Sequence, residues 1–156
     1  MSKVVSVSLS NLQSRFDSEN GRVLYKLGAK APSLGCPASL IRLIDCSGFV
    51  RDALFFATGG KLILPEGSQP QRDWCEENGL YRLKHYSDVE YAREDDSRLF
   101  IAFLSPHPGS EWPRHVWLIH QARTMESCGS HGVCSRDWDN SNLIHAAACY
   151  ELPAAA

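Results

Sequence analysis

The chain has 156 residues, of which 44% are hydrophobic and 22% charged, and its formal net charge is −2 at pH 7. This composition predicts one soluble globular domain spanning residues 1–156. Nucleic acid is excluded as an expected partner, because phosphate binding needs clustered lysine and arginine and the chain has no basic tract. The apolar runs are too short for a membrane span, and the N-terminal segment lacks a signal-peptide pattern.

The first half of the chain carries helical patterns. Apolar residues from Ser8 to Leu27 suit one or two short helices, interrupted near Gly21. Residues 28–40 contain two glycines and two prolines and predict a loop. A helix is predicted over 46–57, with Asp45 as its N-cap. A further short helix is predicted over 70–79.

The second half of the chain changes to strand patterns. Leu99 to Leu104 and His115 to His120 are compact apolar runs, and Ala122 to Glu126 can pair with the second run as a hairpin. Leu143 to Tyr150 predicts a last strand. Helices followed by antiparallel strands indicate an α+β domain.

Cys46 is placed where a thiol can become reactive. The start of a helix offers unpaired N–H groups and partial positive charge, which favour the thiolate. Ser47 and Gly48 are small, so a substrate carbonyl could approach, and the Cys46 N–H could stabilise an oxyanion. The spacing alone leaves a buried structural cysteine equally open.

A nucleophilic cysteine needs a base and a group that orients the base. His115 opens an apolar strand after a proline-rich turn and is the best placed of the six histidines. Glu126 closes the neighbouring hairpin strand and can lie beside the imidazole, and His131 is the competitor for this role. Taken singly, each of these side chains could equally be an ordinary core or surface residue.

Cys128, His131 and Cys134 recur at intervals of three, a spacing that can bind zinc. A fourth ligand is missing from the neighbourhood, so no metal is predicted. A disulfide between Cys128 and Cys134, or a plain glycine-rich turn, accounts for this segment better.

Several motifs in chain order resemble the NlpC-type cell-wall peptidases, which are papain-like cysteine enzymes. The most specific piece is DCSGFV, which resembles the nucleophile motif of that family. The matching segments are Tyr25 to Gly28 (YxxGG), Asp45 to Val50 (DCSGFV), Leu64 to Gln71 (LPxxSxxQ), Arg98 to Leu104 (GDLVFF), His115 to His120 (HVGIYIG) and Thr124 to Ser127 (third polar residue). Ala29 replaces the second glycine of the first motif, the GD before Leu99 is missing, and Trp117 replaces a glycine.

The resemblance implies a papain-like domain whose N-terminal helices, including a nucleophile helix, pack on a twisted antiparallel sheet. Carried over by position, the expected nucleophile is Cys46, the base is His115 and the orienting group is Glu126. The expected substrate-binding residues are Tyr25, Ser47, Gly48 and Trp117.

The activity implied by the resemblance is hydrolysis of an amide bond in peptidoglycan stem peptides, the bond between D-glutamate and the diamino acid, without a cofactor. The chain also looks like the amidase effectors of type VI secretion systems and like phage lysis enzymes. That comparison implies export by a non-Sec route to the periplasm or cell wall, and a cognate immunity protein as inhibitor. Two alternatives stay open: an inactive binding module of the same fold, and a papain-like acyl hydrolase or transferase with another substrate.

Overall fold

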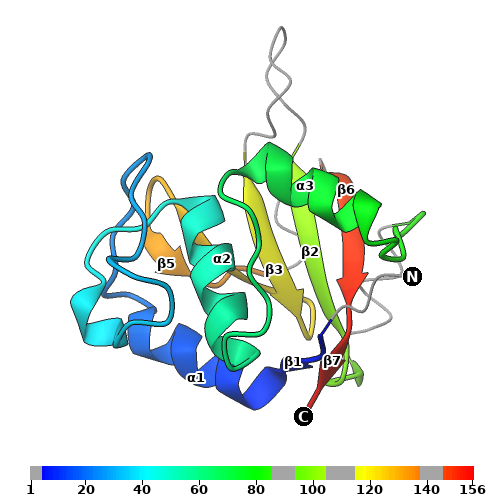
Figure 1. Ribbon diagram of the computed structural model, residues 1–156, viewed down its shortest axis with the longest axis horizontal. Helices are drawn as coiled ribbons and strands as arrows, with labels where there is room; N and C mark the ends of the chain where they lie inside the picture. The colour runs from blue at the N-terminus through cyan, green and yellow to red at the C-terminus, as the bar shows by residue number, and fades with distance from the viewer. Residues whose placement is uncertain (1–4, 86–93, 105–114, 138–145) are drawn as a thin grey trace, which may run out of the picture.

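The computed structural model describes residues 5–85, 94–104, 115–137 and 146–156 (Figure 1). Its helices are α1 (Leu9–Glu19), the short 3-10 helix η1 (Ala38–Leu40), α2 (Cys46–Ala57) and α3 (Ser68–Glu77). Its strands are β1 (Val7–Ser8), β2 (Leu99–Leu104), β3 (Val116–His120), β4 (Arg123–Cys128), β5 (Gly132–Cys134), β6 (Ala146–Leu152) and β7 (Ala154–Ala155). This is the α+β class that the sequence predicted.

Five strands form one antiparallel sheet in the order β5-β4-β3-β2-β6. The β3–β4 hairpin turns through Gln121 and Ala122, whose φ angles of 54° and 57° are both positive. Such a two-residue turn matches the right-handed twist of the paired strands. A separate parallel pair, β1 with β7, brings the two ends of the described chain together.

Helix α2 covers one face of this sheet, and α1 packs against α2 (Figure 1). Phe49, Val50 and Leu54 of α2 are at most 1% exposed and belong to the same buried cluster as Ile101 of β2 and Leu118 of β3. Burying apolar area is the main favourable contribution to folding. The packing therefore fixes the position of α2 against the strands that carry the predicted base and orienting group.

Local sequence explains how α2 begins and ends. Asp45 Oδ1 accepts a hydrogen bond from the Gly48 N–H at 2.7 Å, which satisfies one of the unpaired donors of the first turn. Gly59 and Gly60 follow the helix with φ angles of 62° and 81°, a conformation that side chains with a Cβ disfavour. The predicted helix over 46–57 and its cap are both confirmed.

Two other predicted helices differ from the observed ones. Helix α3 begins at Ser68 rather than at residue 70, because Pro70 lies within the first turn, where its missing N–H costs nothing. Within the segment from Ser8 to Leu27, only Leu9–Glu19 is helical, and it forms α1. After it, Leu24 donates to the Arg42 carbonyl and accepts from Ile44, so tertiary hydrogen bonds hold this part extended.

The predicted strand at residues 99–104 is observed with the same ends. The two predicted strands of the β3–β4 hairpin are observed with end shifts of one or two residues. The last strand begins at Ala146, while the predicted residues 143–145 lie outside the described part of the chain. Within the described ranges, the helices are too short or too polar to cross a membrane.

Candidate active site

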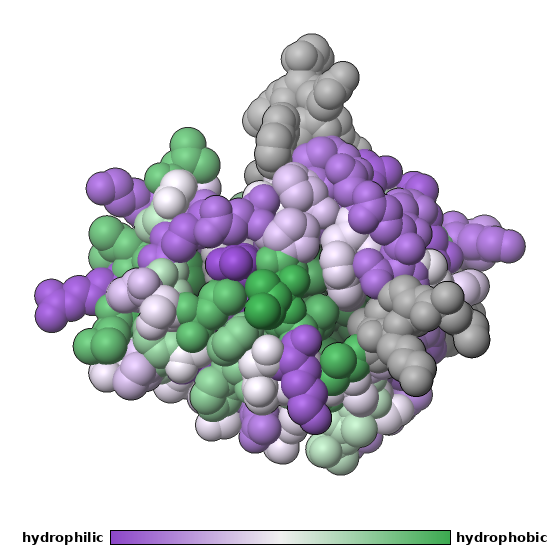
Figure 2. All heavy atoms as spheres, viewed as in Figure 1, coloured by the Kyte–Doolittle hydropathy of each residue, from purple (hydrophilic) through white to green (hydrophobic). Residues whose placement is uncertain are grey.

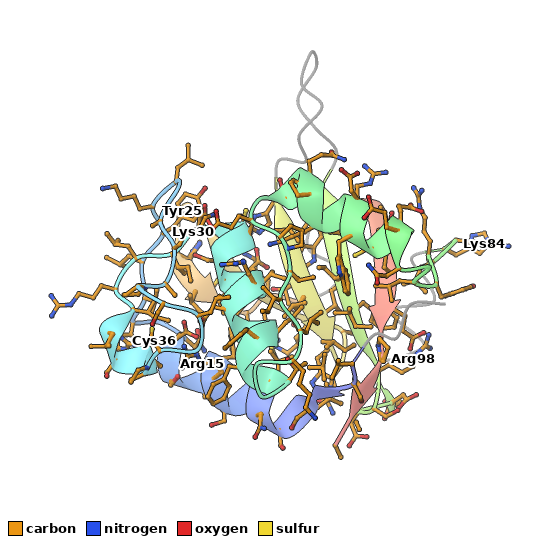
Figure 3. The ribbon with its side chains drawn as sticks, in the orientation of Figure 1. Arg15, Tyr25, Lys30, Cys36, Lys84 and Arg98 are labelled. Atoms are coloured by element: carbon orange, nitrogen blue, oxygen red, sulfur yellow. The ribbon has the colours of Figure 1, made fainter. Side chains whose placement is uncertain are left out.

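Cys46 is the first residue of α2 and is half-buried. The cysteine therefore lies at the N-terminal end of the helix, where unpaired N–H groups and the helix dipole favour negative charge. In Figure 3 the loop that carries Tyr25 and Lys30 lies over this end of α2. This loop contacts the start of α2 through Lys30 and through the Gly28 N–H, which donates to Asp45.

Lys30 is a site residue that the sequence reasoning missed. Its Nζ donates to both carboxylate oxygens of Asp45, at 2.9 and 2.7 Å, and to Ser47 Oγ at 3.2 Å. The capping carboxylate of Asp45 sits beside the nucleophile, and its unpaired negative charge would oppose formation of a thiolate. The ammonium group of Lys30 offsets that charge while leaving the cap in place.

His115 and Glu126 form a buried pair. His115 Nε2 donates to Glu126 Oε1 at 2.9 Å, and the two residues are 9% and 2% exposed. Burial opposes the charged imidazolium, but hydrogen bonds and attraction to Cys46 and Glu126 outweigh it and raise the pKa of His115 to about 9. Burial by itself would raise the pKa of Glu126, but the hydrogen bond to His115 and its positive charge outweigh burial and lower the pKa of this carboxyl group.

The orientation of the imidazole follows from this pairing. Because Nε2 is bonded to Glu126, Nδ1 is the ring nitrogen left to exchange a proton with the Cys46 thiol. A hydrogen bond to Cys46 and attraction to its negative charge are among the causes that raise the pKa of His115. The competitor His131 is exposed, and its Nδ1 lies 2.7 Å from Ser130 Oγ and 3.9 Å from Cys128 Sγ. The structure therefore places Glu126, rather than His131, against His115.

Two buried hydrogen bonds connect the nucleophile segment to other parts of the fold. Ser127 Oγ, next to Glu126 on β4, donates to the Ile44 carbonyl at 2.8 Å. Gln71 Nε2, on α3, donates to the Ser47 carbonyl at 2.9 Å. Both bonds act within two residues of Cys46 and hold the start of α2 in register with the sheet.

Trp117 lies behind the imidazole. Its ring stacks on that of His115 with centroids 5.4 Å apart and planes inclined by 20°, and it is 1% exposed. A side chain this buried supports the base from the sheet rather than presenting a wall to a substrate. Its Nε1 has no hydrogen-bond partner among the described residues.

The other predicted substrate-binding residues differ in burial: Tyr25 is partly accessible, whereas Ser47 and Gly48 are buried. Tyr25 is half-buried, and its pKa is raised first by burial and then by negative charge at Cys46 and Asp45. Ser47 and Gly48 are buried in the first turn of α2. A Cβ at Gly48 would lie 2.7 Å from Asp45 Oδ1, so the cap itself requires glycine there.

Cys128, His131 and Cys134 have a spacing that can bind zinc. In the structure the sulfur atoms of Cys128 and Cys134 lie 3.5 Å apart. In the part of the chain that the structure describes, no group of three or more histidine, cysteine, aspartate or glutamate side chains is arranged to hold a metal ion.

Comparisons with known proteins bear on the fold. No protein-family model matches the sequence, and no curated protein matches it. Among solved structures, an NLP/P60-family lipoprotein-like protein of Staphylococcus aureus aligns with a TM-score of 0.60 and 16% identity, over 95% of this chain and 42% of that one. The chain therefore spans less than half the length of that protein.

Two mycobacterial domains align over about nine tenths of their own length. The P60 domain of an antigen from Mycobacterium avium subspecies paratuberculosis has a TM-score of 0.54 and 14% identity, over 92% of this chain and 90% of that domain. RipD of Mycobacterium tuberculosis, described as a non-catalytic NlpC/p60 domain protein adapted to peptidoglycan binding, has a TM-score of 0.52 and 14% identity, over 86% and 90%. The helices, the antiparallel sheet and these likenesses together show that the chain has the fold of an NlpC/P60 domain.

Proposed function

We propose that the protein is a cysteine peptidase or amidase in which Cys46 is the nucleophile, His115 the general base and acid, and Glu126 the orienting group. The observation that carries the proposal is the buried His115–Glu126 hydrogen bond of 2.9 Å. Cys46, the first residue of α2, is the other hydrogen-bond partner that raises the pKa of His115. A raised His115 pKa favours the imidazolium that must coexist with a thiolate.

The mechanism is acyl transfer. The Cys46 sulfur gives its proton to His115 Nδ1 and attacks the amide carbonyl, while backbone N–H groups at the start of α2 stabilise the oxyanion. The imidazolium then protonates the leaving amine, and a water molecule, deprotonated by His115, hydrolyses the thioester. Glu126 keeps its charge throughout and stabilises the imidazolium.

The inferred substrate is a peptidoglycan stem peptide, cut between D-glutamate and the diamino acid. The substrate class rests on the motif resemblance together with the NlpC/P60 fold of the chain. The place of action in this proposal is the periplasm or the cell wall. A role as a type VI effector or phage lysis enzyme, with an immunity protein as partner of the effector, belongs to the same proposal.

RipD makes an inactive peptidoglycan-binding module the main rival, because a non-catalytic protein shares this fold. The experiment incubates purified protein with defined muropeptides and reads the products by mass spectrometry, with Cys46→Ala and His115→Ala as controls. New fragments from the wild-type protein alone support the proposal. Muropeptides that stay intact but bind the protein in a calorimetric titration would instead establish the binding module.

A second candidate function has one observation in its favour. Leu24, Leu27 and Leu43 are 59%, 82% and 39% exposed, and the first two flank Tyr25 in the loop over the start of α2. Figure 2 shows further apolar surface over the front of α2 and the segment after it, against polar side chains over α3. An acyl hydrolase of lipid-like substrates would use such a surface. Release of fatty acid from acyl esters, abolished by Cys46→Ala, would select this alternative.

A further inference from the structure

Two cysteines face each other at the end of the β4–β5 hairpin, directly beside Glu126. Their sulfur atoms, in Cys128 and Cys134, lie 3.5 Å apart. In the strand register Cys128 pairs with Gly132 and Cys134 pairs with Glu126, so the thiols are diagonal neighbours on one face of the hairpin. The turn at residues 129–131 between them is exposed. Forming a bond of about 2.05 Å therefore needs only a small local movement at an exposed end.

Arg136 joins this pair to the candidate active site. Its Nη2 donates to Cys128 Sγ at 2.6 Å, and its Nε lies 3.9 Å from Glu126 Oε1. Its main chain is fixed by reciprocal bonds with Thr124, at 2.8 and 2.7 Å. One guanidinium is thus shared between a thiol and the carboxylate that orients His115.

The two thiols differ in acidity. Burial opposes ionisation of Cys128, but hydrogen bonds from Cys134 and Arg136 and the guanidinium charge outweigh it and lower the pKa of the thiol. Burial, followed by the bond to Cys128 and its negative charge, raises the pKa of Cys134 to about 12. One sulfur that ionises readily next to one that keeps its proton is an arrangement suited to thiol–disulfide exchange.

Other cysteines of the chain provide a contrast. Cys75 and Cys149 are buried, and burial raises the pKa of Cys75 to about 12 and that of Cys149 further. Neither has an arginine bonded to its sulfur in the described structure, so both are expected to resist oxidation and serve as internal controls.

We propose that Cys128 and Cys134 form a thiol–disulfide modification site that acts on the candidate active site through Arg136 and Glu126. The oxidant is a small disulfide such as oxidised glutathione. The Cys128 thiolate attacks one of its sulfurs and expels a glutathione thiolate. Because the mixed disulfide removes the negative charge of Cys128, which raised the pKa of Cys134, Cys134 then loses its proton to water. Its thiolate attacks Cys128 Sγ and expels the second glutathione thiolate. Two protein thiols are oxidised to one disulfide, and one glutathione disulfide is reduced to two thiols.

Oxidation changes what Arg136 can bind. The sulfur anion disappears, which leaves Glu126 as the nearest acidic partner of the guanidinium among its described contacts. Arg136 then competes with His115 for the carboxylate, and one negative charge is lost from the neighbourhood. Both effects disfavour the imidazolium, so the pKa of His115 is expected to be lower in the disulfide form than in the dithiol form.

The first test measures the modification itself. The full-length protein is equilibrated with reduced and oxidised glutathione at several ratios, free thiols are alkylated, and the cysteines are mapped by mass spectrometry. The expected product is a peptide cross-linked from Cys128 to Cys134, absent from the Cys134→Ser variant and present in the Cys36→Ser control, with Cys75 and Cys149 alkylated only after denaturation. Full alkylation of Cys128 and Cys134 at every ratio, or a lasting glutathione adduct on Cys128, overturns the proposal.

The second test measures the coupling. The His115 imidazole is titrated by NMR in both redox forms of a Cys46→Ser chain, which removes the competing thiol. A downward shift of the His115 pKa on oxidation, absent from an Arg136→Gln variant, is expected, and identical titrations in both forms refute the coupling. The inference concerns the site of the proposed function, but neither readout needs hydrolysis. A failure of the redox pair and a failure to cut muropeptides are therefore observed separately.

Discussion

Replacing Glu126 by glutamine tests the electrostatic account of the His115 pair. The change keeps the shape and a hydrogen-bond acceptor but removes the charge that stabilises the imidazolium. A hydrogen bond to a charged group contributes about 1.5–3 kcal/mol, and each pH unit corresponds to about 1.4 kcal/mol. The pKa of His115, which is about 9 with Glu126 present, is therefore expected to fall by about 1 to 2 units in Glu126→Gln.

The assay is the pH titration of the His115 ring signals by NMR, assigned with a His115→Gln variant and controlled by circular dichroism for folding. Stability provides a second readout with a defined sign. Because the folded pKa of His115 is raised above 6.5, its contribution is complete below pH 6.5 and is lost as pH rises through about 9. Glu126→Gln should flatten the dependence of the free energy of unfolding on pH in this range. A His115 pKa that stays near 9 in the variant would refute the assigned role of the carboxylate.

Three further predictions concern a buried carboxyl group of α1 and two residues that support the site. Glu19 is 1% exposed, and burial raises its pKa from 4.5 to about 7. Its contribution to stability is complete below pH 4.5 and is lost as pH rises through about 7, by on the order of 3 kcal/mol. Urea unfolding of Glu19→Gln should therefore show a flatter profile between pH 4.5 and 7, and an unchanged slope would contradict this. Lys30→Met should slow alkylation of Cys46 by iodoacetamide, because Asp45 is left unneutralised, whereas an unaltered rate would remove Lys30 from the site. Trp117→Ala should lower the free energy of unfolding by about 3–5 kcal/mol, and Trp117→Phe by clearly less; equal losses would argue against a packing role.

Local features of the sequence were sufficient for the elements that carry the site. The 46–57 helix follows from its apolar spacing, from Asp45 as cap and from the glycines after it, all of which act within a few residues. The apolar run at 99–104 likewise predicts its strand. The pairing of His115 with Glu126 could be anticipated because hairpin partners are close in the chain, and the hydrogen bond at 2.9 Å shows that pairing.

Only the tertiary structure decided which segments that are distant in the sequence contact each other. Lys30 reaches Asp45 through a loop whose path depends on long-range backbone bonds, including Asp45 N–H to the Ala29 carbonyl at 2.9 Å. Ser127 bonds to Ile44, 83 residues away in the sequence. Such contacts have no periodicity or local propensity that would reveal them, because they exist only once the sheet and helices have packed. The sequence by itself therefore determined which side chains could react, and packing determined which charges and supports surround them.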